Sequence, residues 1–290
     1  MQQSEDYPAL YRSADAASNE AQASLIFCHK LNIFLLAAAA LMALISTLAI
    51  IVAIISALLF LGSLATYIYM HNKNFQKTWY EARALAESIK TATWRLALSA
   101  EPFNAPSDET NISNFRKLLI ELLYENRGMG AYLSGEHAQQ EQITPMMLSI
   151  IQLPFPEKKQ CYLDSRIVEQ LKWYSKKSGE NRASSKKYFI YLCAAYFAAI
   201  SLLLVRIAYP STPFLPIDLF AVIASSIVGW VQIKRFDELA SAYGLTAHEI
   251  GIIKSRFESV QSSTHLSNFV GDAENAFSRE HTQWAARRDH

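Results

Sequence analysis

One stretch decides the fold of this chain: residues 31–70 read LNIFLLAAAALMALISTLAIIVAIISALLFLGSLATYIYM. This stretch contains no Asp, Glu, Lys, Arg or Pro, and Gly62 is its only glycine. A membrane-spanning helix needs about 20 apolar residues, and one straight helix of this length would reach roughly 60 Å, about double the hydrocarbon thickness. We therefore predict two antiparallel crossings that turn near Ser46 to Ile50. The alternative, one long buried helix of a soluble core, would lack charge on every face.

A second apolar zone, residues 188–232, holds only Arg206 and Asp218 as charged residues. Three prolines within residues 210–216 interrupt it, and proline cannot continue a helix. Two more crossings are therefore expected, over residues 188–209 and 214–232. The predicted fold class is an all-α membrane protein with two transmembrane hairpins, four crossings in all, extended into a cytoplasmic helical bundle.

Basic residues predict the orientation of these crossings. They flank both hairpins on one side, whereas the two short turns carry almost none; they are Lys30, Lys73, Lys77, Lys176, Lys177, Arg182, Lys186, Lys187, Lys234 and Arg235. The positive-inside rule then places both termini and residues 71–187 in the cytoplasm. Some 25 polar residues precede the first apolar run, which argues against a cleaved signal peptide. We expect a multi-pass protein of the cell inner membrane.

The composition excludes several classes of function. The chain has 290 residues and a net charge of +1, so bulk charge does not predict binding to nucleic acid. Its three cysteines, Cys28, Cys161 and Cys193, lie far apart and predict no disulfide framework. The sequence shows no phosphate-cradling glycine-rich loop, no HExxH and no paired Cys/His metal spacing. We therefore expect no enzyme, no catalytic residues, no metal and no cofactor.

The segment after the first hairpin places aromatic and charged residues on one helical face. Trp79, Arg83, Glu87, Lys90 and Trp94 follow one another at helical spacing, and Arg166, Gln170, Trp173, Lys177 and Asn181 repeat this pattern before the second hairpin. Such faces predict helix packing with buried polar contacts; the alternative is a surface that binds a partner or ligand. The predicted packing and assembly residues are Trp79, Arg83, Glu87, Trp94 and Trp284.

Several of these motifs resemble the SLATT family, the SMODS- and SLOG-associating two-transmembrane effectors. The resemblance rests on residues 10–18, on Trp79-Tyr80 through Arg95 with Glu101-Pro102-Phe103, and on a second set in the C-terminal half. That second set comprises Tyr162, Arg166-Ile167, Gln170, Trp173-Tyr174, Lys177, Asn181, Glu238-Leu239-Ala240, Tyr243, Phe269-Val270, Glu274, Ser278-Arg279-Glu280-His281 and Trp284.

The resemblance implies two tandem modules. The first covers residues 1–110 with a hairpin at about 31–70, residues 111–160 form a cytoplasmic connecting segment, and the second module covers residues 161–290 with a hairpin at about 188–232. It also implies a membrane effector of bacterial antiphage defence that depolarises the cell when a linked sensor fires. The implied partners are a nucleotide-producing or nucleotide-sensing protein and a nucleotide or oligonucleotide ligand.

A pore needs polar or small side chains on a spanning helix. Asp218, Ser225, Gly229 and Gln232 form one weakly polar stripe on the fourth predicted crossing and are the candidate pore-lining residues. The alternative is ordinary packing, which small and hydroxyl residues also mediate in membranes. Four helices of one chain leave little room for water, so conduction would require a homo-oligomer in the lipid bilayer.

A ligand site would have to be built from cytoplasmic basic residues. The candidates are Lys172, Trp173, Lys176, Lys177 and Arg182, whose cations suit phosphates and whose indole suits a base. The alternative is that these cations only set the topology and meet anionic lipid headgroups. For the whole chain, the alternative function is a non-conducting membrane scaffold that recruits a cytoplasmic partner.

Overall fold

The computed structural model describes residues 1, 3–42, 49–212 and 215–286, and the side-chain surroundings of these residues other than 49 and 278–286. Every regular element within these ranges is helical, which confirms the all-α fold class. The predicted turn of the first hairpin, Ser46 to Ile50, falls mostly on residues 43–48, outside the described residues.

Four helices are long and apolar enough to cross a membrane, as predicted. They include α1 (Ala9–Met42), α2 (Ala49–Lys73), α8 (Glu169–Ala208) and α9 (Ile217–Lys234). The apolar stretch supplies the C-terminal part of α1 and nearly all of α2. Its lack of proline and of charge explains why both helices run uninterrupted to the turn.

The chain forms two compact units. The membrane unit contains residues 23–75 and 177–241, and the head unit contains residues 1–22, 76–176 and those from 242 onward. The helices α1, α8 and α10 (Phe236–Arg256) each continue without a break from one unit into the other.

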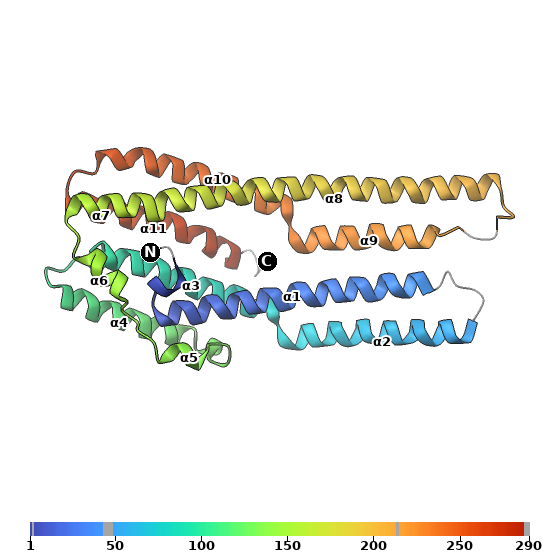
Figure 1. Ribbon diagram of the computed structural model, residues 1–290, viewed down its shortest axis with the longest axis horizontal. Coiled ribbons are helices and arrows are strands. Elements are labelled where there is room, and N and C mark those ends of the chain that lie inside the picture. The colour runs from blue at the N-terminus through green and yellow to red at the C-terminus, as the bar shows by residue number, and fades with distance from the viewer. Residues whose placement is uncertain (2, 43–48, 213–214, 287–290) are drawn as a thin grey trace. The chain divides into compact units, whose positions relative to one another are not determined.

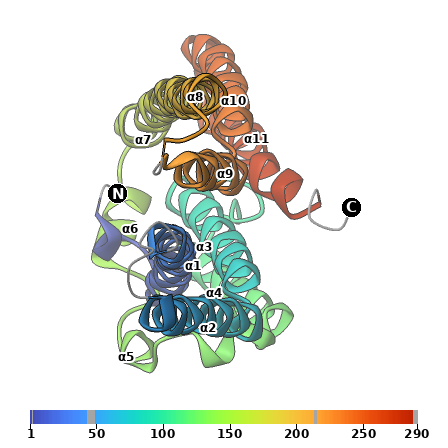
Figure 2. The same ribbon diagram turned by 90° about the vertical axis from the view of Figure 1, so that its right-hand side faces the viewer.

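The four helices of the membrane unit stand in one row, in the order α8, α9, α1 and α2 (Figures 1 and 2). The first hairpin is closed by a hydrogen bond from the Ser63 hydroxyl to Oδ1 of Asn32. Close packing one residue earlier adds to this, since a side chain at Gly62 would approach Leu35 to 3.6 Å. In the described residues these helices lie beside one another and do not surround a central space (Figure 2).

Most of the membrane unit's surface is left for lipid or for other chains. In the apolar windows of three of the four spanning helices only 6% of residues are buried within the chain. Large apolar side chains such as Leu58, Phe197 and Ile207 are accordingly more than half exposed. That is the distribution expected of helices whose solvent is hydrocarbon.

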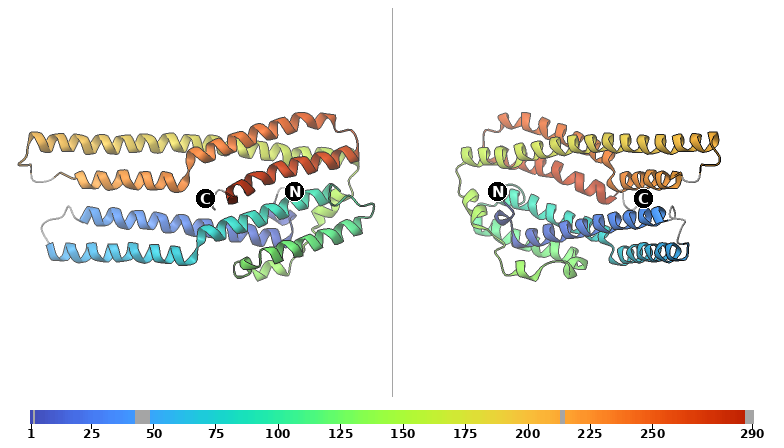
Figure 3. Two further views of the ribbon diagram at one scale, coloured as in Figure 1. Left: turned by 180° about the vertical axis from the view of Figure 1, so that it is seen from behind. Right: turned by 45° about the vertical axis from the view of Figure 1, so that its right-hand side comes forward.

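The head unit contains α3 (Phe75–Ala97), α4 (Asp108–Glu125), α5 (Gly135–Ala138), α6 (Pro145–Ile151), α7 (Phe155–Tyr162) and α11 (Ser263–Ala286), together with the N-terminal parts of α1 and α8 and most of α10 (Phe236–Arg256). Figure 3 shows α11 lying between α10 and α3. The head unit also contains four short irregular helices: η1 (Ser4–Asp6), η2 (Arg127–Ala131), η3 (Leu163–Val168) and η4 (Phe257–Ser259).

Both halves of the sequence contribute to the larger hydrophobic core of the head unit. Trp94 and Phe115 come from the N-terminal half, and Tyr162, Ile250 and Val270 come from the C-terminal half. The ring centres of Trp94 and Tyr162 lie 5.7 Å apart in an edge-on arrangement that aromatic pairs favour. Each half of the sequence therefore buries apolar surface of the head unit against the other half.

Candidate functional site

The predicted pore-lining residues lie on α9 and face away from the rest of their own chain. Asp218, Ser225 and Gln232 are exposed, and a side chain added at Gly229 would meet nothing within 4 Å. Ala224, one position from Ser225, is buried and marks the packed side of α9. The structure thus places the four residues on one open face, where a second chain or lipid would cover them.

Two hydroxyl groups of α2 form hydrogen bonds within their own hairpin. Ser63 is buried and donates to Asn32, and the Thr66 hydroxyl donates to the carbonyl oxygen of Gly62 over 2.8 Å. Such bonds satisfy the hydroxyl groups in a surrounding that offers no water. Ser63 and Thr66 therefore contribute less to an open polar face than the exposed Asp218, Ser225 and Gln232 of α9.

The basic residues predicted to bind a ligand lie together on α8. Lys172, Lys176 and Arg182 are exposed, and the Nζ of Lys177 is paired with Oε2 of Glu180 at 2.9 Å. Trp173 is 38% exposed, and its ring packs edge-on against Tyr243 of α10 at 5.5 Å between ring centres. This indole is thus partly used in packing, and Lys172, next to it in the sequence, is exposed.

The packing residues of α3 occupy different surroundings. Arg83 pairs with Glu87 over 2.6 Å and with Asp15 of α1 over 3.6 Å. Trp79 stacks on Tyr80 with ring centres 4.8 Å apart. The Trp284 side chain lies outside the described residues, although its backbone belongs to α11.

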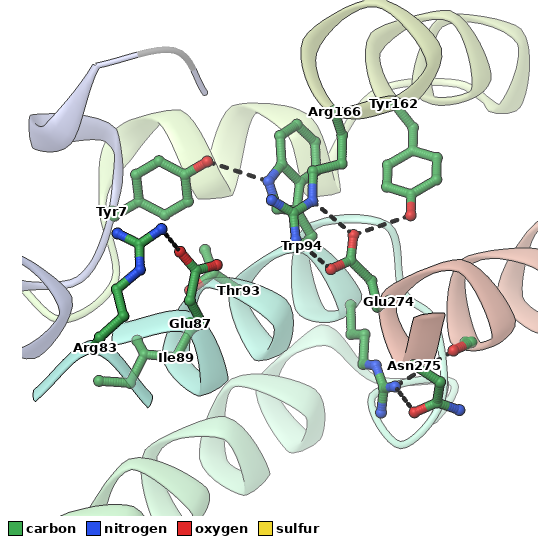
Figure 4. A network of polar contacts seen from close by, with 12 residues as sticks. Tyr7, Arg83, Glu87, Ile89, Thr93, Trp94, Tyr162, Arg166, Glu274 and Asn275 are labelled. Carbon is green, nitrogen blue, oxygen red and sulfur yellow. Dashed lines mark hydrogen bonds and ion pairs between the residues drawn. The ribbon is translucent and has the colours of Figure 1, made fainter. Parts of the chain in front are cut away.

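Trp94 is fully buried and has a hydrogen-bond partner at its polar edge. Its indole nitrogen donates to the hydroxyl oxygen of Tyr7 over 3.1 Å (Figure 4). Burial raises the pKa of Tyr7 to about 12, so this phenol remains protonated at neutral pH. The Nζ of Lys90 lies over the Tyr7 ring, 5.8 Å from its centre.

The head unit contains a fully buried ion pair between Arg166 and Glu274. The Arg166 Nε and Nη2 atoms donate to the two carboxylate oxygens of Glu274 over 2.9 and 2.6 Å, and the Tyr162 hydroxyl adds a third bond of 2.9 Å (Figure 4). The guanidinium also lies 4.9 Å from the centre of the Phe277 ring. Two-point pairing of this kind fixes both distance and direction.

Electrostatics keep the Arg166 guanidinium protonated in its buried place. Burial alone would lower the pKa of Arg166, but the charge of Glu274 more than offsets this and raises the pKa above its usual value. Burial and the same carboxylate raise the pKa of Tyr162, which therefore stays a donor. The charged pair and the neutral phenol form one network that joins η3 and α7 to α11.

The backbone that carries Arg166 is unusual. The segment η3 is a π-helix, with a wider turn than an α-helix, and it sits between α7 and α8. Single π-turns are rare and occur mostly at functional positions. Here the wide turn ends at Val168, and α8 then runs as one helix for 40 residues into the membrane unit.

Sequence reasoning did not identify the pairing of Arg166 with Glu274. Both residues belong to the motifs that resemble the SLATT family, but they are 108 positions apart, and helical spacing reports only on one face of one helix. Tyr162, four residues before Arg166, offered a local signal, since the i,i+4 spacing places both side chains on one face. In the described ranges no group of three or more His, Cys, Asp and Glu side chains is close enough to hold a metal ion.

Comparison with protein families matches nearly the whole chain. A family model described as SMODS and SLOG-associating 2TM effector domain 3 matches residues 8–159, and one described as SMODS and SLOG-associating 2TM effector domain 1 matches residues 162–284. The first match also spans residues 111–160, which the sequence analysis kept as a connecting segment. Neither the curated proteins nor the solved structures gave a match. The chain belongs to the SLATT family, as the resemblance implied, and carries two of its 2TM effector domains in tandem.

Proposed function

We propose that this protein is a homo-oligomeric pore or channel of a bacterial antiphage defence system, and that its opening depolarises the inner membrane and arrests growth. The family description, a 2TM effector associated with SMODS and SLOG proteins, supports the role of membrane effector. The observation that carries the conducting role is the open face of α9, with Asp218, Ser225 and Gln232 exposed.

Energetics favour covering this face with another chain rather than with lipid. A charged side chain at the centre of a membrane helix costs about 2.5–3.5 kcal/mol on insertion scales, and the cost falls toward the interface. Asp218 lies in the first turn of α9, at the N-terminal end of that helix. Ser225 lies in the middle of α9. Around a symmetry axis, several copies of this face would line a narrow aqueous path with hydroxyl and amide groups.

Activation by a nucleotide or oligonucleotide is the second element of the proposal. The exposed cations Lys172 and Lys176 and the partly exposed Trp173 offer charge for phosphate and a ring for a base. A ligand opens a pore only if it binds the open state more tightly than the closed state. Because α8 is uninterrupted from the head into the membrane unit, a change at its N-terminal part has a rigid route to the crossing.

The alternative function, a scaffold that recruits a partner without conducting, has support of its own on α4. Ile120, Leu123 and Tyr124 lie at i, i+3 and i+4 and are 53%, 41% and 73% exposed. Neighbouring apolar side chains on a head-unit helix suit contact with a protein, and the family description names SMODS and SLOG associations. Both functions act without catalysis, and we propose no enzymatic activity.

Assembly and gating test the proposal together. Native mass measurement in mild detergent and in lipid should give one closed oligomer, and a strict monomer in both would contradict the pore.

Replacing Lys176 and Lys177 by Gln should change signal-dependent conductance while leaving insertion and assembly intact. Unchanged gating in that variant would move the trigger to a docked protein, for which α4 is the candidate surface.

A further inference from the structure

Two lysines lie close to one tryptophan on the side of the membrane that the positive-inside rule predicts to be cytoplasmic: Lys30 at the start of the apolar part of α1, and Lys234 at the end of α9. The Nζ of Lys30 lies 5.9 Å and the Nζ of Lys234 lies 5.5 Å from the ring centre of Trp230. Lys30 belongs to the first hairpin and Lys234 to the second, so the cluster joins the two hairpins of the membrane unit. Figures 1 and 2 show α1 and α9 as neighbours in the row.

This cluster has no anion of its own among the described residues. The salt bridges in those ranges involve neither Lys30 nor Lys234, and Glu238, close to Lys234 in sequence, is paired with Arg235 at 2.7 Å. Two ammonium groups beside one ring repel each other, and the electron-rich face of the indole compensates only partly. A bound anion between them would relieve this repulsion.

A third donor points to the same conclusion. The indole nitrogen of Trp230 is buried and, within the described part of the chain, has no hydrogen-bond partner. Buried donors of this kind are rare, since leaving one unsatisfied costs about 1–3 kcal/mol. Lys30 and Lys234 therefore both lie near the ring of a tryptophan whose own N–H lacks an acceptor.

The position of these three residues along the membrane normal indicates which anion they would meet. Lys30 directly precedes the apolar stretch of α1, and Trp230 and Lys234 stand one helical turn apart at the end of α9. Tryptophan and lysine at the end of an apolar helix mark the headgroup level of a bilayer. At that level the abundant anion is the phosphate of a phospholipid, and basic pockets between spanning helices are known to hold such groups.

We propose that Lys30, Lys234 and Trp230 bind the phosphate group of one anionic phospholipid, which ties the first hairpin to the second. The ammonium groups neutralise the phosphate and the indole N–H donates to one of its oxygens. The site requires only that the four helices span a membrane, and it stands whether or not the oligomer conducts.

The test uses the purified full-length chain in detergent, with phosphatidylglycerol or phosphatidylcholine added, and native mass spectra that count retained lipids. The wild-type protein should retain one phosphatidylglycerol per chain in preference to phosphatidylcholine. The Lys30→Gln/Lys234→Gln variant should retain it about 30-fold more weakly, since each lysine near an anionic headgroup contributes a factor of about five. Trp230→Phe should weaken retention to a smaller degree, because it removes the N–H and keeps an aromatic ring.

The matched control is Lys73→Gln/Lys187→Gln, which removes the same charge at the same ends of the hairpins. It should retain the lipid as the wild-type protein does, and the helical circular dichroism of all variants should be equal. Equal loss in the control, or no loss in Lys30→Gln/Lys234→Gln, would overturn the proposal. Inorganic phosphate at millimolar concentration should not displace the lipid; efficient displacement would show a site for soluble phosphate compounds instead and overturn the lipid assignment.

Discussion

Asn74 and Arg235 occupy matching places in the two hairpins. Each stands between a lysine and a phenylalanine where the returning helix of its hairpin ends, and each adopts a left-handed backbone conformation, with φ of 48° and 49°. Residues of L configuration enter this region at a cost of about 1–2 kcal/mol, and asparagine tolerates it better than most. In both Lys-Xaa-Phe segments, one residue with positive φ therefore ends a membrane helix, α2 or α9, and the next helix, α3 or α10, begins directly after it. We call this residue the break.

The first prediction concerns this break. Asn74→Gly and Arg235→Gly should leave the midpoint of thermal unfolding in detergent unchanged or slightly raised, because glycine adopts positive φ without strain. Asn74→Val should lower stability by about 1–2 kcal/mol, since a β-branched residue fits this conformation poorly. Gln76→Val, two residues later on the exposed surface of α3, is the control and should cost only a few tenths of a kcal/mol. Equal loss at both positions would mean that the break carries no strain.

The buried ion pair of the head unit gives the second prediction. Glu274→Ala should destabilise the protein by about 3–5 kcal/mol, because it leaves the Arg166 guanidinium buried without a counter-charge. Replacing both partners, Arg166→Met with Glu274→Met, should recover a large part of the loss. Thermal unfolding measures both effects. Glu81→Ala, which removes the partly exposed partner of Lys77, should cost under about 1 kcal/mol, and an equal cost in the two single variants would contradict the account.

The sequence alone predicts the local features of this chain better than the contacts between its distant segments. The first hairpin is predicted by the length of the apolar stretch and by its lack of charged residues, and the second by the prolines of residues 210–216. Both predictions work because bilayer thickness fixes how long a spanning helix must be. Helical spacing likewise predicts the stripe of α9. It does not predict that Arg166 meets Glu274 or that Lys30 meets Trp230, because these contacts join distant segments and depend on tertiary packing. The left-handed break at Arg235 has no local signal, since arginine rarely adopts that conformation.

Lys90 should make stability depend on pH in the alkaline range. Its burial lowers its pKa in the folded protein, with Glu87 opposing and Arg166 and Arg83 adding to the shift, whereas the unfolded chain titrates near the ordinary value of 10.5. Between the two values the unfolded state holds more protons, so stability rises with pH. The free energy of unfolding of the wild-type protein minus that of Lys90→Met should therefore increase between pH 7 and 10.5. A constant or falling difference would show that Lys90 is not desolvated.

The orientation in the membrane is open to a labelling test. A cysteine at Ser211, in the turn between α8 and α9, should react with an impermeant reagent from outside the cell, because the loops without basic residues face outward. A cysteine at Ser107, in the exposed residues before α4, should react only after the membrane is opened. The native cysteines Cys28, Cys161 and Cys193 are replaced by Ala in both variants. The reverse pattern would contradict the assignment of both termini and of residues 71–187 to the cytoplasm.

The central claim is that the exposed face of α9 lines an ion path in an oligomer. Its most direct measurement is ion flux through liposomes that contain the purified Ser225→Cys variant without its native cysteines, recorded with and without nucleotide signals. A matched variant, Ile200→Cys, carries its cysteine at an exposed apolar position of α8. The account predicts a flux that a charged thiol reagent blocks or strongly reduces in Ser225→Cys and leaves unchanged in Ile200→Cys. Liposomes that stay tight under every condition, or a flux that modification of Ser225→Cys does not affect, would contradict it.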